Sequence, residues 1–313
     1  MNTLVIIPCH NEELSITATI ESVYTNIQNP TIWVIDNLSS DLTAQKATES
    51  GATVLSSPQL GKGYAIRHAF SRVSSDFDLV LIIDGDDTYS TAEFTLASEQ
   101  VLNHGYDMVV GNRVLANTHD SSRTQAFRSG HSSGNYMLSK IFKLLFGIEI
   151  KDTQSGWRVM SIGFVKSFTH GASEFEIETE LNAHAYLLNA AVSSLPVEYR
   201  GRHLGSSSKL QTYGDGIKIL RKLLHLFRAE RPLIAYSTLG LPWLISSILL
   251  FSRVLPDYFQ TLFVSKIPSL IAGVGCFIIA SLLWVTGMIL EKVRLIRVGH
   301  ARSLYSNFMQ INV

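Results

Sequence analysis

The sequence predicts an α/β protein whose mostly parallel sheet carries helices on both faces, followed by an amphipathic helix and two transmembrane helices. Short apolar runs alternate with helical patterns over the first 112 residues, which is typical of parallel sheets buried on both faces. A basic amphipathic segment begins at residue 217. Two long segments without charged residues follow it, at 233–251 and 267–290.

Each element of the sheet has its own pattern. Near-continuous apolar runs predict strands at 4–8, 31–36, 79–84 and 107–112. Helical patterns lie from about Glu13, after Asp41, over Tyr64–Ser74 and around Ala92–Asn103. Farther along we expect helices at 132–147 and 175–188 and a returning edge strand at 191–199. Sheets of this type bind ligands beyond the carboxyl ends of their strands.

Composition and charge exclude several classes of protein. The 26 Lys and Arg residues balance 26 Asp and Glu residues, so no global charge indicates a nucleic-acid partner. Two cysteines, Cys9 and Cys276, imply no disulfide framework, and we interpret both as small buried side chains. The N-terminus lacks the basic start and long apolar core of a signal peptide, so the first domain is expected in the cytoplasm.

The two charge-free segments are long enough to cross a membrane. They have nineteen and twenty-four residues, and a span needs about 20. A pair of buried helices in a soluble protein is the alternative, but charge-free runs of this length are rare there. The outer flanks are basic, at Arg228, Arg231, Lys292, Arg294, Arg297 and Arg302. This excess predicts a multi-pass protein of the inner cell membrane, with the first domain and both termini on the cytoplasmic side.

The segment 217–232 combines an apolar side with basic residues. Ile217, Leu220, Leu224 and Phe227 lie on one side of the predicted helix, among lysines and arginines. A helix of this kind can lie in a membrane interface. The alternative is an ordinary surface helix that packs on the first domain.

Three carboxylates follow the apolar run of the strand at 79–84. Asp84 and Asp86 lie two residues apart at the edge of the sheet where ligands bind. Two carboxylates so close need a cation, and hard oxygen ligands suit Mg²⁺ or Mn²⁺ shared with substrate phosphates. The alternative role is to cap the helix that follows, which would suit Asp87.

Two further features lie at the same edge. Asp36 and Asn37 end the second strand, where a carboxylate and an amide can bind a base or ribose. The turn GKGYA at 61–65 places Lys62 before a helix, where backbone N–H groups and an ammonium can contact phosphates. The dinucleotide fingerprint is incomplete, because Ile66 occupies the place of its third glycine.

The order of the motifs resembles a known family. The chain carries VIIPCHNEE, VIDNLSSDLT, GKGYA, DGDD, GNR and DTQSGWR in this order, and this order resembles that of the inverting family 2 glycosyltransferases of GT-A fold. More narrowly, the chain resembles the polyprenyl-phosphate glycosyltransferases, meaning the dolichol-phosphate mannosyl synthases and bactoprenol glucosyl transferases. The resemblance covers about residues 4–210, and the two predicted spans are typical of the bactoprenol branch.

The resemblance implies a reaction and its substrates. A sugar passes with inversion from a nucleotide-diphosphate sugar, UDP-glucose as first choice, to undecaprenyl phosphate in the membrane. It implies a divalent ion, Mg²⁺ or Mn²⁺, and is compatible with a homo-oligomer and a flippase partner. The implied domains are a cytoplasmic GT-A catalytic domain at 1–212, an interfacial helix at 213–232, transmembrane helices at 233–255 and 262–290, and a cytoplasmic tail at 291–313.

The resemblance also assigns residues. The metal ligands would be Asp84 and Asp86, and the catalytic residues Asp86 and Asp152. The residues expected to bind the nucleotide sugar are Pro8, Asn11, Glu12, Asp36, Asn37, Lys62, Asp84 and Gly85. The residues expected to bind the acceptor phosphate are Arg113, Arg128, Ser132, Arg200, Arg202 and Lys209. One departure is Thr88, which stands where some members have a glutamine metal ligand, so its role is left open.

Two other functions remain as alternatives. A processive polysaccharide synthase would carry Gln-x-x-Arg-Trp and more spans, whereas here Trp157 precedes Arg158 after Gln154. A non-catalytic membrane scaffold could keep a transferase fold, but the intact acids argue against it.

Overall fold

The computed structural model describes residues 1–115, 131–168, 177–202 and 212–310. The chain divides into two compact units, one made of Met1–Leu223 with His300–Val313 and the other of Leu224–Gly299. Arg128 and Lys209 lie outside the described residues, and so does the side chain of Ser132.

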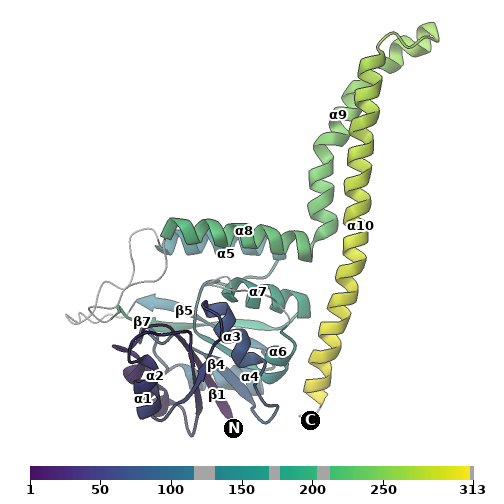
Figure 1. The fold of residues 1–313 in the computed structure, drawn as a ribbon. Helices are drawn as coiled ribbons and strands as arrows, with labels where there is room; N and C mark the ends of the chain where they lie inside the picture. The colour runs from purple at the N-terminus through teal and green to yellow at the C-terminus, as the bar shows by residue number, and fades with distance from the viewer. Residues whose placement is uncertain (116–130, 169–176, 203–211, 311–313) are drawn as a thin grey trace. The chain divides into compact units, whose positions relative to one another are not determined.

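The first unit is built around one sheet, which the described strands form in the order β3-β2-β1-β4-β6-β5-β7 (Figure 1). The strands are β1 (Thr3–Cys9), β2 (Thr31–Asp36), β3 (Thr53–Ser56), β4 (Leu79–Ile82), β5 (Met108–Leu115), β6 (Arg158–Ser161) and β7 (Val192–Tyr199). The pairs β1–β2, β1–β4, β2–β3 and β5–β7 are parallel. Among the described strands, only β6 runs antiparallel to its two neighbours, β4 and β5.

Helices connect the strands. They are α1 (Ile16–Asn26), α2 (Thr43–Glu49), α3 (Lys62–Phe70), α4 (Phe94–Asn103), α5 (His131–Phe146), α6 (Ile162–Lys166) and α7 (Ile177–Leu188). In β1 both alternating sets of side chains, Leu4 and Ile6 on one face and Val5 and Ile7 on the other, are completely buried. Both faces of the sheet are therefore covered, which explains the continuous apolar runs of its central strands.

The predicted α/β class and mostly parallel sheet are confirmed. The strands β1, β2, β4 and β5 lie where the apolar runs predict them, and β7 is the predicted edge strand. The sequence analysis missed β3 and β6, which have four residues each. Segments so short carry no period, and β6 begins with the polar Arg158.

The second unit contains a helical hairpin. Its helices are the end of α8 (Thr212–Glu230), α9 (Pro232–Thr261) and most of α10 (Ile267–Gln310). Within the hairpin α9 and α10 run side by side (Figure 1), and the Ser247 hydroxyl donates to the Gly273 carbonyl at 2.9 Å. Gly240 and Gly287 allow close approach, because a Cβ there would lie 3.4 Å and 3.1 Å from atoms of the facing helix.

The hairpin helices are long and apolar enough to cross a membrane. Only 17 % of the most apolar window of each helix is buried within the chain, whereas the core helices of soluble proteins are mostly buried. At their polar end, the completely buried Glu230 accepts from Arg297 at 2.5 Å and lies 3.5 Å from Arg294. Helix α10 continues through the segment 291–310, for which the sequence analysis predicted a tail without assigning structure.

Candidate active site

The sheet brings the predicted ligand residues to one edge. Cys9 at the end of β1 is in register with Asp36 at the end of β2. The next strand on the other side, β4, leads directly into Asp84 and Asp86. Gly85 allows this turn, because a Cβ there would lie 2.4 Å from the sulfur of Cys9. The parallel arrangement therefore places the nucleotide candidates and the metal candidates side by side.

Asp84 shares the ammonium of Lys62 with a second acid, Glu178. Lys62 Nζ lies 2.7 Å from Asp84 Oδ1 and 2.5 Å from Glu178 Oε1. Burial raises the pKa of Asp84, but the Lys62 ammonium, with Arg202 and Arg113, outweighs it and lowers the pKa below its usual value. Asp84 is therefore an ionised, partly exposed carboxylate at neutral pH.

Asp86 is oriented by its own turn and paired with an arginine. Its Oδ1 accepts from the Thr88 hydroxyl at 2.6 Å, and its Oδ2 lies 2.5 Å from the Arg202 guanidinium. Burial raises the pKa of Asp86 in spite of Arg202, and the charge of Asp84 adds to the rise. Thr88 thus orients the acid, a contribution that does not require it to be a metal ligand.

Asp152 is held by a bidentate ion pair with Arg113. Arg113 Nε donates to Oδ2 at 2.6 Å and Nη2 donates to Oδ1 at 2.8 Å. The Asp152 carboxylate is almost completely buried, and the Arg113 guanidinium also lies over the ring of Tyr199. Such a pair fixes both side chains more firmly than a single hydrogen bond does.

The loop after Asp152 packs directly against Asp84. A Cβ on Gly156 would lie 2.3 Å from Asp84 Oδ2, so only glycine allows this approach. The Gly156 amide donates to the Tyr89 hydroxyl at 3.0 Å. The buried Arg158 donates to the carbonyls of Thr153 and Ser155, which holds the loop in shape. The loop therefore brings Asp152 and Asp84 into one site.

The predicted nucleotide residues form a network at the ends of β1 and β2. The Asn37 amide donates to the Gln59 carbonyl and accepts from Gly61 N, both at 2.6 Å, so it holds the glycine turn before Lys62. Asp36 accepts from Ser39 N at 3.2 Å and remains partly exposed. Their contacts with a nucleotide stay a prediction.

Three further predicted residues lie around the same loops. Asn11 accepts from Ser40 N, and Glu12 N donates to the Thr43 hydroxyl. Pro8 is partly buried in β1. These contacts join the end of β1 to the loop that follows β2.

Of the predicted acceptor residues, the structure describes the side chains of three arginines. Arg113 binds Asp152, Arg202 binds Asp86, and Arg200 pairs with Glu198 at 3.0 Å. Arg113 and Arg202 both lie close enough to Asp84 to lower its pKa. Two of the three are thus part of the acidic site, whereas Arg200, just after the end of β7, pairs with Glu198 on that strand.

The donor set suits a divalent ion. Asp84 and Asp86 supply hard carboxylate oxygens, and their charges interact. Within the described ranges no group of three His, Cys, Asp or Glu side chains converges on one point. Two carboxylates fit Mg²⁺ or Mn²⁺, which usually complete their shell with water and substrate phosphates. Lys62 and Arg202 face the two carboxylates and could contact the same phosphates.

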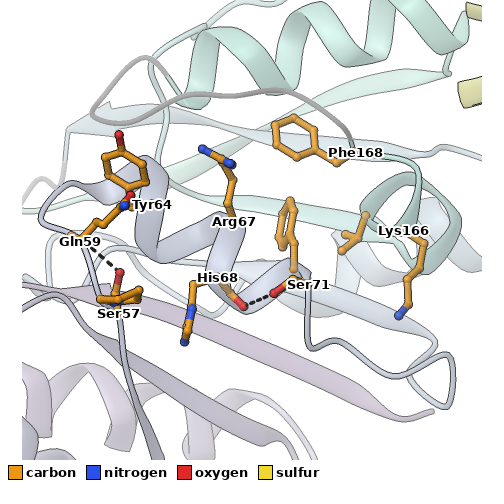
Figure 2. A pocket seen from close by; sticks show the side chains of 11 residues that line it. Ser57, Gln59, Tyr64, Arg67, His68, Ser71, Lys166 and Phe168 are labelled. Carbon is orange, nitrogen blue, oxygen red and sulfur yellow. Dashed lines mark hydrogen bonds between the residues drawn. The ribbon is translucent and has the colours of Figure 1, made fainter. Parts of the chain in front are cut away.

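A separate cavity of about 620 Å³ lies beside α3 and α6. Figure 2 shows Tyr64 and Arg67 on α3, with Phe168 across from Arg67. His68 and Lys166 also line it, which gives its wall a basic character. None of the carboxylates described above lines this cavity.

Sequence reasoning missed Glu178. It lies in the first turn of α7 and is 5 % exposed. A signal was present, because Glu176, Glu178 and Glu180 cluster at the start of the helix predicted at 175–188, and carboxylates that become buried need partners.

The chain was compared with known proteins and structures. The profile of glycosyl transferase family 2 matches residues 4–168, more than half of the chain. RfbJ of Shigella flexneri is 42 % identical over 130 residues, which are 42 % of this chain and 95 % of RfbJ. Glycosyltransferase AglJ of Haloferax volcanii is 29 % identical over 237 residues, 75 % of each chain.

A solved structure shares the fold. Glucosyl-3-phosphoglycerate synthase from Mycobacterium tuberculosis, in complex with Mn²⁺ and UDP-glucose, superimposes with a TM-score of 0.55 and 20 % identity. The match covers 72 % of this chain and 78 % of the synthase. At this identity the likeness shows the fold alone, and it agrees with the GT-A fold implied by the motifs. The chain belongs to glycosyl transferase family 2 and is a nucleotide-sugar glycosyltransferase.

Proposed function

We propose that this protein transfers a hexose, glucose from UDP-glucose as first choice, to undecaprenyl phosphate with inversion at the anomeric carbon. The observation that carries the proposal is the meeting of Asp84, Asp86 and the Arg113–Asp152 pair at one sheet edge. The same chain carries two helices of membrane-spanning length. The solved structure with Mn²⁺ and UDP-glucose supports the donor class and the ion.

Asp84 and Asp86 would hold the Mg²⁺ or Mn²⁺. When bound, the ion neutralises the charge that develops on the departing nucleoside diphosphate. Lys62 and Arg202 contact the two acids and supply positive charge beside the diphosphate. The remaining nucleotide contacts are proposed for Pro8, Asn11, Glu12, Asp36, Asn37 and Gly85.

The acceptor phosphate is its own nucleophile. A phosphate monoester has a second pKa of about 6, so it is largely ionised at neutral pH and needs no strong base. Arg113 and Arg202 reduce the repulsion between two anionic substrates. Asp152, fixed by Arg113, would orient the acceptor or stabilise positive charge on the sugar ring. Arg128, Ser132, Arg200 and Lys209 are proposed as further acceptor-phosphate contacts.

The membrane location follows from the acceptor. A polyprenyl tail stays in the bilayer, so the catalytic domain must bind the lipid's phosphate at the membrane surface. We assign 1–212 as the catalytic domain, 213–232 as an interfacial helix, 233–255 and 262–290 as spans, and 291–313 as a tail. Basic flanks favour a cytoplasmic domain and cytoplasmic termini in the inner membrane. A homo-oligomer and a flippase partner stay predictions.

One experiment tests the proposal. Membranes that contain the full-length protein are incubated with undecaprenyl phosphate and labelled UDP-glucose, UDP-galactose, UDP-N-acetylglucosamine or GDP-mannose, with and without EDTA. We expect one sugar per lipid phosphate from one donor, and loss of the product with EDTA. A polymeric product would favour a processive synthase. The absence of turnover with every donor would favour a scaffold.

A further inference from the structure

We propose that Glu178 recognises the transferred sugar, with its carboxylate accepting a hydrogen bond from a hydroxyl group of the donor's hexose. This inference rests on the proposed function, because it names a specificity residue for the same site. Glu178 would act together with Lys62, which binds the other oxygen of its carboxylate.

The first observation is a buried oxygen without a partner. Glu178 is 5 % exposed, and its Oε1 accepts from Lys62 at 2.5 Å. Its Oε2 is buried and has no hydrogen-bond partner among the residues that the structure describes. A buried carboxylate oxygen left without a donor is unfavourable, so a ligand that supplies a donor there is stabilised.

The second observation is the position of this oxygen. The Lys62 ammonium touches both Glu178 and Asp84, so the two carboxylates lie on either side of one cation. Asp84 is the acid proposed to hold the ion on the diphosphate. The hexose is bonded directly to that diphosphate. Glu178 contacts the same Lys62 ammonium as Asp84, and it is therefore within reach of the sugar.

The third observation is that hydrogen bonds hold the start of α7 against the loop that follows Asp152. The residue after it, Thr179, accepts from the Gln154 amide at 3.0 Å. One turn later, Asn182 donates to the Thr153 carbonyl at 3.0 Å. Both partners directly follow Asp152. The first turn of α7 is thus held close to both Asp84, the acid proposed to hold the ion, and Asp152, the acid proposed to orient the acceptor. The hexose would lie in this region.

The chemistry of the oxygen selects the ligand group. A carboxylate oxygen accepts hydrogen bonds and repels phosphate, so the group at Oε2 must be a donor without negative charge. The hydroxyl groups of a hexose satisfy this requirement, and the diphosphate does not. Holding Lys62 needs only one oxygen of Glu178, so a purely structural role leaves the second oxygen unexplained.

The test combines a variant with altered donors. Wild-type protein and Glu178→Ala are assayed with undecaprenyl phosphate, using UDP-glucose and its 2-, 3-, 4- and 6-deoxy analogues; if another donor supports transfer, its own deoxy series replaces them. We expect Glu178→Ala to lower kcat/KM for the intact donor about 10- to 100-fold, as for a hydrogen bond to a charged group. For one deoxy analogue the same substitution should change kcat/KM less than about twofold, because the interaction is already absent.

Binding separates sugar recognition from an effect through Lys62. Calorimetry of Glu178→Ala should show unchanged affinity for UDP and weakened affinity for UDP-glucose. Equal losses for UDP and UDP-glucose, or equal losses of kcat/KM across all deoxy donors, would overturn the inference. Glu180→Ala, the same substitution two residues later on α7, is the matched control and should leave the preference among donors unchanged.

The wild-type data can overturn the inference even if Glu178→Ala folds poorly. One deoxy donor should lose at least tenfold in kcat/KM relative to the intact donor, and Glu178→Gln, which keeps the shape of the side chain, should reduce that ratio. If wild-type protein uses all four deoxy donors as well as the intact one, the inference is wrong while the proposed function stands. If wild-type protein transfers no sugar from any donor, the proposed function itself has failed.

Discussion

Arg113 binds Asp152 through two parallel hydrogen bonds, of 2.6 Å from Nε to Oδ2 and 2.8 Å from Nη2 to Oδ1. An acid held in this way is fixed in orientation. This geometry favours a role in positioning or in charge stabilisation, and it agrees with the proposed acceptor phosphate, which would be its own nucleophile.

Replacement of Asp152 by asparagine tests this role. The Asp152→Asn side chain keeps nearly the same shape but loses its charge and one acceptor for Arg113. We expect kcat to fall at least about 100-fold, which corresponds to roughly 2.7 kcal/mol of lost transition-state stabilisation. UDP affinity should stay within about twofold of the wild-type value. A kcat within threefold of wild type, measured in the same membranes, would contradict the assignment.

Removal of Asp86 tests the proposed metal site. Asp86→Ala should abolish transfer and reduce Mn²⁺ affinity, measured by the electron paramagnetic resonance of free Mn²⁺, while the circular dichroism spectrum stays unchanged. Thr88→Val removes only the hydroxyl that donates to Asp86 at 2.6 Å. It should weaken Mn²⁺ binding about tenfold, the usual size of an effect on a residue that orients a ligand. Thr88→Ser keeps the hydroxyl and is the control, and tenfold weaker binding in that variant would show that the hydroxyl is not responsible.

Arg202 should have opposite effects on the ion and the donor. Its guanidinium lies 2.5 Å from Asp86, where it would compete with the proposed metal ion for the carboxylate. With Arg202→Gln, Mn²⁺ in the absence of nucleotide should bind about 3- to 10-fold more tightly, because a competing positive charge is gone. UDP-glucose should bind more weakly, because the same charge is proposed to contact the diphosphate. Titration calorimetry measures both, and a change of the same sign for both ligands would refute this dual role.

Gly156 should tolerate no side chain. Gly156→Ala places a Cβ 2.3 Å from Asp84 Oδ2, so either the loop or the acid must move. We expect at least a tenfold loss of kcat/KM and a lower Tm, since overpacking of a tight site costs about 1–3 kcal/mol. Gly275→Ala in α10 is the control, because a Cβ there meets no atom within 4 Å. Wild-type kinetics in Gly156→Ala would show that the contact is not needed.

Sequence pattern alone was enough to predict the α/β class, the central strands and the two apolar helices. Each of these rests on local information: the apolar runs of β1 and β4, or the lack of charge over 233–251 and 267–290. The acids Asp84 and Asp86 were found for the same reason, since they follow a buried strand and lie two residues apart. The short strands β3 and β6 were not predicted, because a strand of four residues is too short to show a periodic pattern.

The partners of these acids came from packing. Lys62 and Glu178 are 116 positions apart in the chain, and Arg113 and Asp152 are 39 apart. No period or spacing relates such residues. They meet because the antiparallel strand β6 brings the loop of Asp152 and Gly156 between β4 and β5, and because α7 packs on that loop. Local composition selects helices and strands, whereas the pairing of charges in the site depends on long-range packing that buries them together.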